Sequence, residues 1–190
     1  MTKFEKRLNQ ILDRLTSNDL LQGTGLGNEL AFYIFDYPPE EELLVRDHIK
    51  VLLNLLPKKQ PDIKFIHINL FELLIKYLKN RNLLDRAIML QRGKGDKETF
   101  KALKAPLDAG RIAKVFTEEA RPAEHDLVLV SGVGSVYPLI RTHSLLSNLH
   151  PLMDSTPLVM FYPGVYSGQW LRLFGRLDED NYYRAFQLVP

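Results

Sequence analysis

Polar side chains follow several short apolar runs in this 190-residue sequence, and they are the first candidates for chemistry. Asp36, Asn69 and Ser131 stand at or next to the ends of such runs, and Ser135 follows in a glycine-containing loop. If the runs are parallel strands, these residues meet at the carboxyl edge of the sheet, where open α/β folds bind ligands. We therefore expect a polar crevice lined by Asp36, Asn69, Ser131 and Ser135.

The chemistry available to this crevice is limited. The loop at 132–137 begins like a dinucleotide-binding fingerprint, but Tyr137 stands where the third glycine would allow close packing of helix and strand. Neither serine lies in a Gly-x-Ser-x-Gly elbow, no Walker lysine is present, and the five histidines lack metal-ligand spacing. We expect no enzyme activity, cofactor or metal. A degenerate nucleotide-binding regulatory domain remains as an alternative.

An aromatic and basic segment follows the last long apolar run. It holds Trp170, the one tryptophan in the chain. Tryptophan, tyrosine and arginine are frequent anchors of protein interfaces, so we consider a partner surface made of Tyr166, Gln169, Trp170, Arg172 and Arg176. The alternative is that these aromatic residues pack the end of the chain onto the core. Because Gln169 and Arg172 are polar neighbours, we expect Trp170 to be partly exposed.

Positive charge is concentrated between Arg81 and Lys114. This stretch holds nine basic and four acidic residues, although the whole chain carries a net charge of only +2. Such a stretch is either a solvated helical face or an electrostatic contact for nucleic acid or an acidic partner. Whether DNA is contacted directly stays open at this point. The residues considered for a nucleic-acid contact are Lys94, Lys97, Lys101 and Lys104.

Apolar periodicity indicates the elements that must position these residues. Runs rich in β-branched and aromatic residues predict buried strands at 31–35, 63–68, 127–131 and 158–162, with a last edge strand at 183–189. Helical spacing predicts helices at 4–15, 70–78, 83–90, 98–103, 111–116 and 136–149. One more helix, which starts near residue 40 and is ended by Pro57, is so apolar that we expect it to be heavily buried.

Together these elements predict an α/β fold. We expect a single three-layer domain over residues 1–190, with a mostly parallel central sheet of about four to five strands. The connection between the second and third strands is longer than a minimal crossover, which predicts a helical, basic insertion at about 70–120. The chain lacks cysteine and any apolar run near the ~20 residues of a membrane helix. We expect a cytoplasmic protein without membrane contact.

Several motifs resemble a known family. They are 129–143 (LVSGVGSVYPLIRTH), 156–175 (TPLVMFYPGVYSGQWLRLFG), 181–186 (NYYRAF), 35–39 (FDYPP) and 43–46 (LLVR). Together they resemble the BrxB family of bacteriophage-exclusion (BREX) systems, and the resemblance spans nearly the whole chain. These motifs are specific to the family but carry no known reaction, so no catalytic residues can be transferred to this sequence.

The resemblance implies a role in prokaryotic phage defence. BrxB-like proteins accompany a site-specific adenine methyltransferase, a large AAA-type ATPase and the phosphatase-like protein PglZ. The methyltransferase marks host DNA, and the system blocks phage replication. The resemblance thus implies a non-catalytic assembly or adaptor protein that supports methylation and phage exclusion, with PglZ as its expected direct partner. A non-specific DNA-binding subunit of the same complex is a further alternative.

Overall fold

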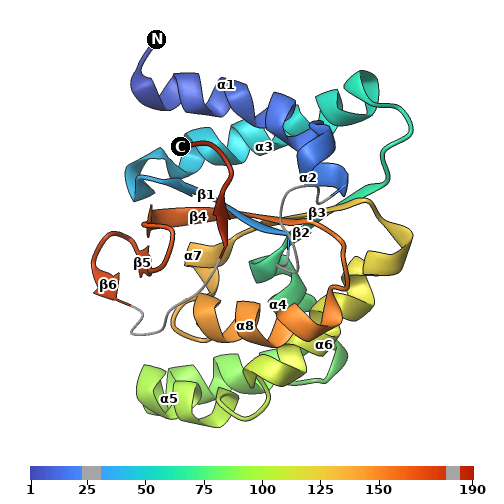
Figure 1. Cartoon of the computed structure of the whole chain (residues 1–190). Coiled ribbons are helices and arrows are strands. Elements are labelled where there is room, and N and C mark those ends of the chain that lie inside the picture. Colours follow the sequence, from blue (N-terminus) through green and yellow to red (C-terminus); the bar gives the residue numbers. More distant parts are fainter. Residues whose placement is uncertain (23–30, 179–184) are drawn as a thin grey trace.

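Three layers make up the fold in the computed structural model, which describes residues 1–22, 31–178 and 185–190. A parallel sheet forms the middle layer (Figure 1). Helices α1 (Lys3–Leu15) and α3 (Glu42–Lys59) cover one face, together with the short α2 (Asn18–Gln22). Helices α4 (Leu70–Asn80), α6 (Ala109–Ala120) and α8 (Thr142–Leu149) cover the other. The predicted three-layer α/β class is confirmed.

The sheet has the strand order β2-β3-β4-β1-β7. Its members are β1 (Phe32–Tyr37), β2 (Phe65–Asn69), β3 (Leu127–Ser131), β4 (Leu158–Tyr166) and β7 (Phe186–Gln187), and every neighbouring pair is parallel. Beyond the sheet, β4 pairs antiparallel with β5 (Leu171–Leu173), and β5 pairs with β6 (Leu177–Asp178). The predicted last edge strand is present as β7, although positions 183 and 184 lie outside the described residues.

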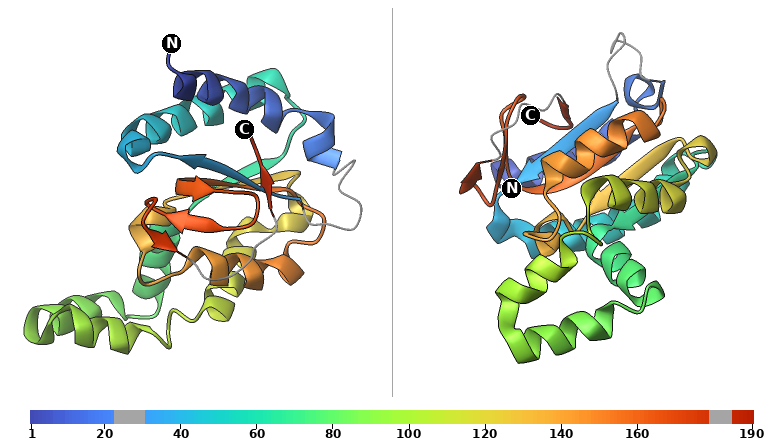
Figure 2. Two further views of the ribbon diagram at one scale, coloured as in Figure 1. Left: turned by 60° about the vertical axis from the view of Figure 1, so that its left-hand side comes forward. Right: turned by 90° about the horizontal axis from the view of Figure 1, so that it is seen from below.

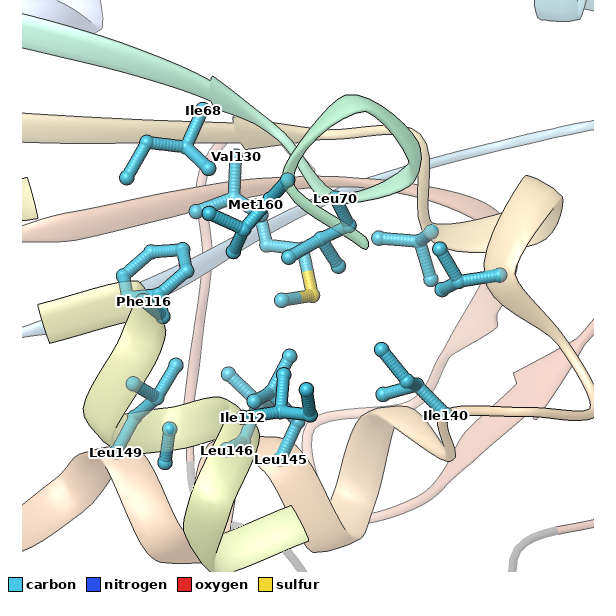
Figure 3. Close-up of a cluster of buried hydrophobic side chains, with 14 of the residues drawn as sticks. Ile68, Leu70, Ile112, Phe116, Val130, Ile140, Leu145, Leu146, Leu149 and Met160 are labelled. Carbon is cyan, nitrogen blue, oxygen red and sulfur yellow. The ribbon is translucent and has the colours of Figure 1, made fainter. Parts of the chain in front are cut away.

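Alternation along the strands creates two hydrophobic cores. Phe32, Val130 and Met160 point to the face covered by α4, α6 and α8, whereas Phe35 and Leu129 point to the face covered by α1 and α3. Figure 3 shows the first core, where side chains of α6 and α8 approach the underside of the sheet. Because both faces of the sheet are buried, its strands are almost continuously apolar, as expected for a parallel sheet.

The insertion between β2 and β3 consists of α4, α5 (Leu84–Leu103) and α6. Helix α5 lies farthest from the sheet and projects from the body of the molecule (Figures 1 and 2). Its backbone bends sharply at Gly95, whose φ of +80° is a conformation that glycine adopts without strain. Within α5 only Leu103 is buried. We call residues 84–104 the helical arm.

Three sequence predictions about helices are wrong. The region 136–149 is not one helix, because the short α7 (Val133–Val136) ends before Pro138, which has no amide hydrogen to continue it. Helix α3 is not heavily buried, since it packs only one face, through Val45, Ile49, Leu52 and Leu56, against the sheet and α1. It also continues to Lys59 with Pro57 in its last turn.

No helix in the described ranges is both long and apolar enough to cross a membrane.

Candidate functional site

The carboxyl ends of the parallel strands meet at one edge of the sheet, as the sequence predicts. Strand β1 ends at Tyr37, β2 at Asn69 and β3 at Ser131, while β4 continues past the sheet into the hairpin with β5. The loops that leave this edge start helices α3, α4 and α7. All four proposed crevice residues therefore lie at the same edge, and their hydrogen bonds decide what chemistry is available.

Asp36 is held by structural hydrogen bonds. Its Oδ1 accepts hydrogen bonds from Nη2 of Arg7 at 2.7 Å and Nε2 of Gln187 at 3.2 Å, and its Oδ2 accepts one from the amide of Tyr166 at 3.2 Å. Arg7 also donates to the carbonyl of Val189 at 2.8 Å. The carboxylate thus joins α1, β1, β4 and the C-terminal segment, and its acceptor sites are largely used in doing so.

Asn69 serves as the N-cap of α4. Its side-chain oxygen accepts hydrogen bonds from the amides of Phe71 at 3.0 Å and Glu72 at 3.3 Å, which would otherwise lack partners in the first helical turn. Gly132 packs directly on this side chain with φ at +76°, and a Cβ there would clash with the Asn69 oxygen. This contact gives the glycine after β3 a packing role.

Ser131 pairs with His67 across the two neighbouring strands. Oγ of Ser131 lies 2.8 Å from Nε2 of His67, and both side chains are mostly buried. Burial lowers the pKa of His67, and the nearby Glu72 carboxylate partly offsets this effect, so the neutral ring is favoured. Among the described residues no hydrogen-bond acceptor orients the other ring nitrogen, so the pair lacks the third member of a catalytic triad.

Ser135 belongs to a polar network that links α7 to the start of α3. Its Oγ lies 3.4 Å from Nη2 of Arg46, and Nε of Arg46 donates to Oε1 of Glu42 at 2.7 Å. The other oxygen of Glu42 accepts a hydrogen bond from the hydroxyl of Tyr37 at 2.6 Å. Burial and this hydrogen bond raise the pKa of Tyr37 well above its usual range. The network fixes the loop after β1 against the loop after β3.

The crevice residues do not converge on one substrate-sized cavity. Asn69 lines a hollow of about 140 Å³ on the outer side of β2, together with His67, Glu72 and Lys76. Asp36 and Ser135 belong to separate hydrogen-bond networks. The described residues also contain no cluster of His, Asp or Glu suited to a metal ion.

The aromatic segment lies in the hairpin that extends from the same edge. Trp170 sits in the turn between β4 and β5 with 48% of its surface exposed, in agreement with the expectation from its polar neighbours. Its amide donates to Oγ of Ser167 at 3.2 Å, and its carbonyl accepts from the Ser167 amide at 3.1 Å. These two bonds hold the turn and present the indole ring to solvent.

The other residues of the proposed partner surface divide into two groups. Gln169, Arg172 and Arg176 are exposed and lie close to Trp170 in the sequence. Tyr166 is buried at 4% exposure, and its hydroxyl both donates to the Ala185 carbonyl at 2.6 Å and accepts from the Ala185 amide at 2.9 Å. Tyr166 is therefore a buried support of the hairpin and not part of its exposed surface.

Exposed apolar side chains gather at this edge. Leu43, at 72% exposure, and Leu44 begin α3, Phe71 begins α4, and Val165 lies near the end of β4. With Trp170 they form what we call the edge surface. Large apolar side chains clustered on a surface often mark interaction sites. Sequence reasoning missed Leu43 and Leu44 because it assigned the whole apolar face of α3 to the core.

The lysines considered for nucleic acid all lie on the helical arm. Lys94 precedes the bend at Gly95, and Lys97, Lys101 and Lys104 follow it at helical spacing. All four are exposed. Phe100 is exposed on the same side as Lys97 and Lys104, because residues three and four apart share a helix face.

Comparison with known proteins gives a consistent result. The family model described as "BREX protein BrxB" matches residues 66–188. A protein from Bacillus cereus (strain H3081.97) described as "BREX protein BrxB" is 39% identical over 193 aligned positions, covering all of this chain and 99% of the relative. A protein from Escherichia coli O9:H4 (strain HS) with the same description is 42% identical over 187 positions, covering 98% of this chain and 92% of the relative. No solved structure matches the chain significantly.

Proposed function

This chain belongs to the BrxB family of BREX proteins, which places it in phage defence, and we propose that it acts there as a non-catalytic adaptor that binds PglZ. In this role it supports host DNA methylation and phage exclusion by holding other components together. The methyltransferase and the AAA-type ATPase of the system are its further expected neighbours.

The exposed Trp170 carries this proposal. Trp170 is held in the turn of a fixed hairpin, and the same segment carries exposed arginines; exposed tryptophan and arginine together are typical of an interface hot spot. Leu43, Leu44 and Val165 add apolar area at the same edge. We propose the edge surface, with Gln169, Arg172 and Arg176 beside it, as the contact for PglZ.

The polar residues of the edge favour an adaptor over a catalyst. Asp36, Asn69 and Ser131 each make hydrogen bonds that join secondary-structure elements. A nucleotide-binding regulatory domain would instead need free donors around a phosphate-sized space. The Ser131–His67 pair lacks an orienting acid among the described residues, which gives little support to nucleophilic catalysis.

Affinity capture at native expression level tests the adaptor role. The tagged chain is isolated from a strain with a complete BREX system, with and without nuclease treatment, and bound proteins are quantified by mass spectrometry. The proposal expects PglZ in both samples at a comparable ratio. Loss of PglZ after nuclease treatment would indicate a bridge through DNA, and its absence from both samples would contradict the proposal. Deletion of the chain should abolish both host methylation and phage protection.

A further inference from the structure

The positive charges between Arg81 and Lys114 lack ion-pair partners among the described residues. None of the nine basic side chains in this stretch forms a salt bridge with a carboxylate in the part of the chain that the structure describes. In α1 and α3, by contrast, Arg7, Arg14, Arg46, Lys50 and Lys59 are all paired. Single lysines of α1 and α3, such as Lys3, Lys6 and Lys58, are also unpaired within the described ranges, but the stretch from Arg81 to Lys114 gathers nine such charges on the side of the sheet where the helical arm projects (Figure 1).

Three of these charges border a groove between α4 and α6. The groove has a volume of about 550 Å³. Its apolar lining comes from Leu73, Tyr77 and Val115, and its unpaired basic residues are Arg81, Arg111 and Lys114. The guanidinium of Arg81 lies over the Tyr77 ring, 5.7 Å from its centroid. An apolar floor is thus bordered by cations whose charges are not neutralised by neighbouring carboxylates.

The acidic residues of the groove do not cancel this charge. Glu119 accepts hydrogen bonds from Nζ of Lys76 at 2.7 and 2.9 Å, so it is already paired. Glu118 is the one unpaired carboxylate among the described residues that line the groove, and it faces three unpaired cations. The balance at the groove remains positive.

The groove continues toward the helical arm. The hydroxyl of Tyr77 donates to the carbonyl of Pro106 at 3.1 Å, so the segment that follows Lys104 packs against α4 at the groove. On the other side of α6, a second hollow of about 560 Å³ shares Arg111 and Lys114 with the first. The basic rim therefore extends around α6 and lies beside the segment that follows the arm.

We propose that the groove between α4 and α6 is the docking site for an acidic protein segment that carries at least one large apolar side chain. This inference rests on the proposed function, because the segment belongs to PglZ, the partner proposed there. Carboxylates of the segment pair with Arg81, Arg111 and Lys114, and its apolar side chain covers Tyr77 and Val115. A nucleic-acid backbone matches this groove less well, because its phosphates gain nothing from an apolar floor.

The test compares two charge-reversed triple variants of the full chain for binding to purified PglZ. The groove variant is Arg81→Glu, Arg111→Glu and Lys114→Glu. The control is Lys3→Glu, Lys6→Glu and Lys58→Glu, which changes the net charge equally at exposed positions of α1 and α3. Glutamate at 111 suits the first turn of α6, where the helix dipole favours negative charge, so folding should be retained. Melting curves verify this for both variants.

Binding is measured by biolayer interferometry at about 0.05 M and about 0.3 M salt. At the lower salt, the groove variant should bind PglZ at least about tenfold more weakly than the unmodified chain does. The control should bind like the unmodified chain. Equal binding by both variants would overturn the groove but leave the adaptor role intact, whereas failure of the unmodified chain to bind PglZ would overturn both. Tight binding of a fluorescent DNA duplex at physiological salt, lost in the groove variant, would assign the groove to nucleic acid and also overturn the inference.

As a second check on the apolar floor, Val115→Asp adds a carboxylate to the groove without removing a cation. It should weaken PglZ binding at both salt concentrations, because it places a charge where an apolar side chain should pack. Unchanged binding by a folded Val115→Asp variant would rule out the apolar part of the contact.

Discussion

Arg7 and Asp36 form an ion pair that is largely withdrawn from solvent, with Nη2 of Arg7 2.7 Å from Oδ1 of Asp36 and both side chains below 20% exposure. The guanidinium also lies over the Phe35 ring, 5.0 Å from its centroid. Through this pair, α1 and the end of the chain are fixed to the carboxyl end of β1. Asp36, which the sequence suggests as part of a ligand crevice, thus has a structural role.

The first prediction concerns the stability that this pair provides. Arg7→Ala leaves the Asp36 carboxylate partly buried without its cation, so we expect a loss of about 2–4 kcal/mol in the free energy of unfolding. Lys50→Ala removes a largely solvent-exposed pair with Asp47 and should change stability by less than about 0.5 kcal/mol. Urea denaturation measures both. If the chain is a single domain, as we propose, each curve should show one transition. Equal stability of the two variants would contradict the role of the Arg7–Asp36 pair.

The second prediction concerns pH and His67. Burial lowers the pKa of this histidine in the folded chain, so the unfolded chain binds its proton more readily. The contribution of His67 to stability is therefore complete above its unfolded pKa of about 6.5 and decreases as pH falls through the folded pKa. His67→Gln keeps a polar partner for Ser131 but does not titrate. Thermal melts from about pH 7.5 to about pH 5 should show a smaller decrease for this variant; identical decreases would contradict the assignment.

The third prediction concerns nucleotides. Because the chain has no Walker lysine and the crevice residues hold the fold together, the purified protein should neither bind ATP tightly nor hydrolyse it. Isothermal calorimetry with millimolar ATP and magnesium measures this. A stoichiometric heat with micromolar affinity would instead support the nucleotide-binding alternative.

The fourth prediction concerns the helical arm and DNA. We expect little DNA binding by the isolated chain at physiological salt. Any binding seen at low salt should be non-specific and decrease steeply with salt, because phosphate contacts release counterions. Lys97→Glu, Lys101→Glu and Lys104→Glu together should abolish it, whereas Lys3→Glu, Lys6→Glu and Lys58→Glu should not. Submicromolar binding of a labelled duplex at physiological salt would make the chain a DNA-binding subunit.

The strands could be predicted from the sequence because burial on both faces leaves a strong local pattern. The apolar runs around Ile34, Val128 and Met160 lie in β1, β3 and β4, and the parallel pairing follows from the helices between them. The long insertion between β2 and β3 was also predicted, because its length and helical periodicity are visible in the chain.

The edge surface could not be predicted from the sequence. Periodicity identifies the apolar residues of a helix but not which of them pack against the core. Leu43 and Val51 were therefore assigned to the core, although both are exposed. The pairing of Arg7 with Asp36 joins positions 29 residues apart, and no local pattern encodes it. The groove between α4 and α6 likewise depends on how Tyr77 and Val115 are brought together by the fold.

The affinity of Trp170→Ala for purified PglZ, measured by biolayer interferometry, tests the adaptor account most directly. Because Trp170 is half exposed, the variant should melt near the temperature of the unmodified chain. Its affinity for PglZ should fall about 30-fold, because hot-spot tryptophans contribute about 2 kcal/mol or more to binding. Val51→Ala, which trims an equally exposed apolar side chain on α3, should bind normally. Unchanged affinity of a folded Trp170→Ala variant would contradict the account, as would a melting temperature so low that the ring must belong to the core.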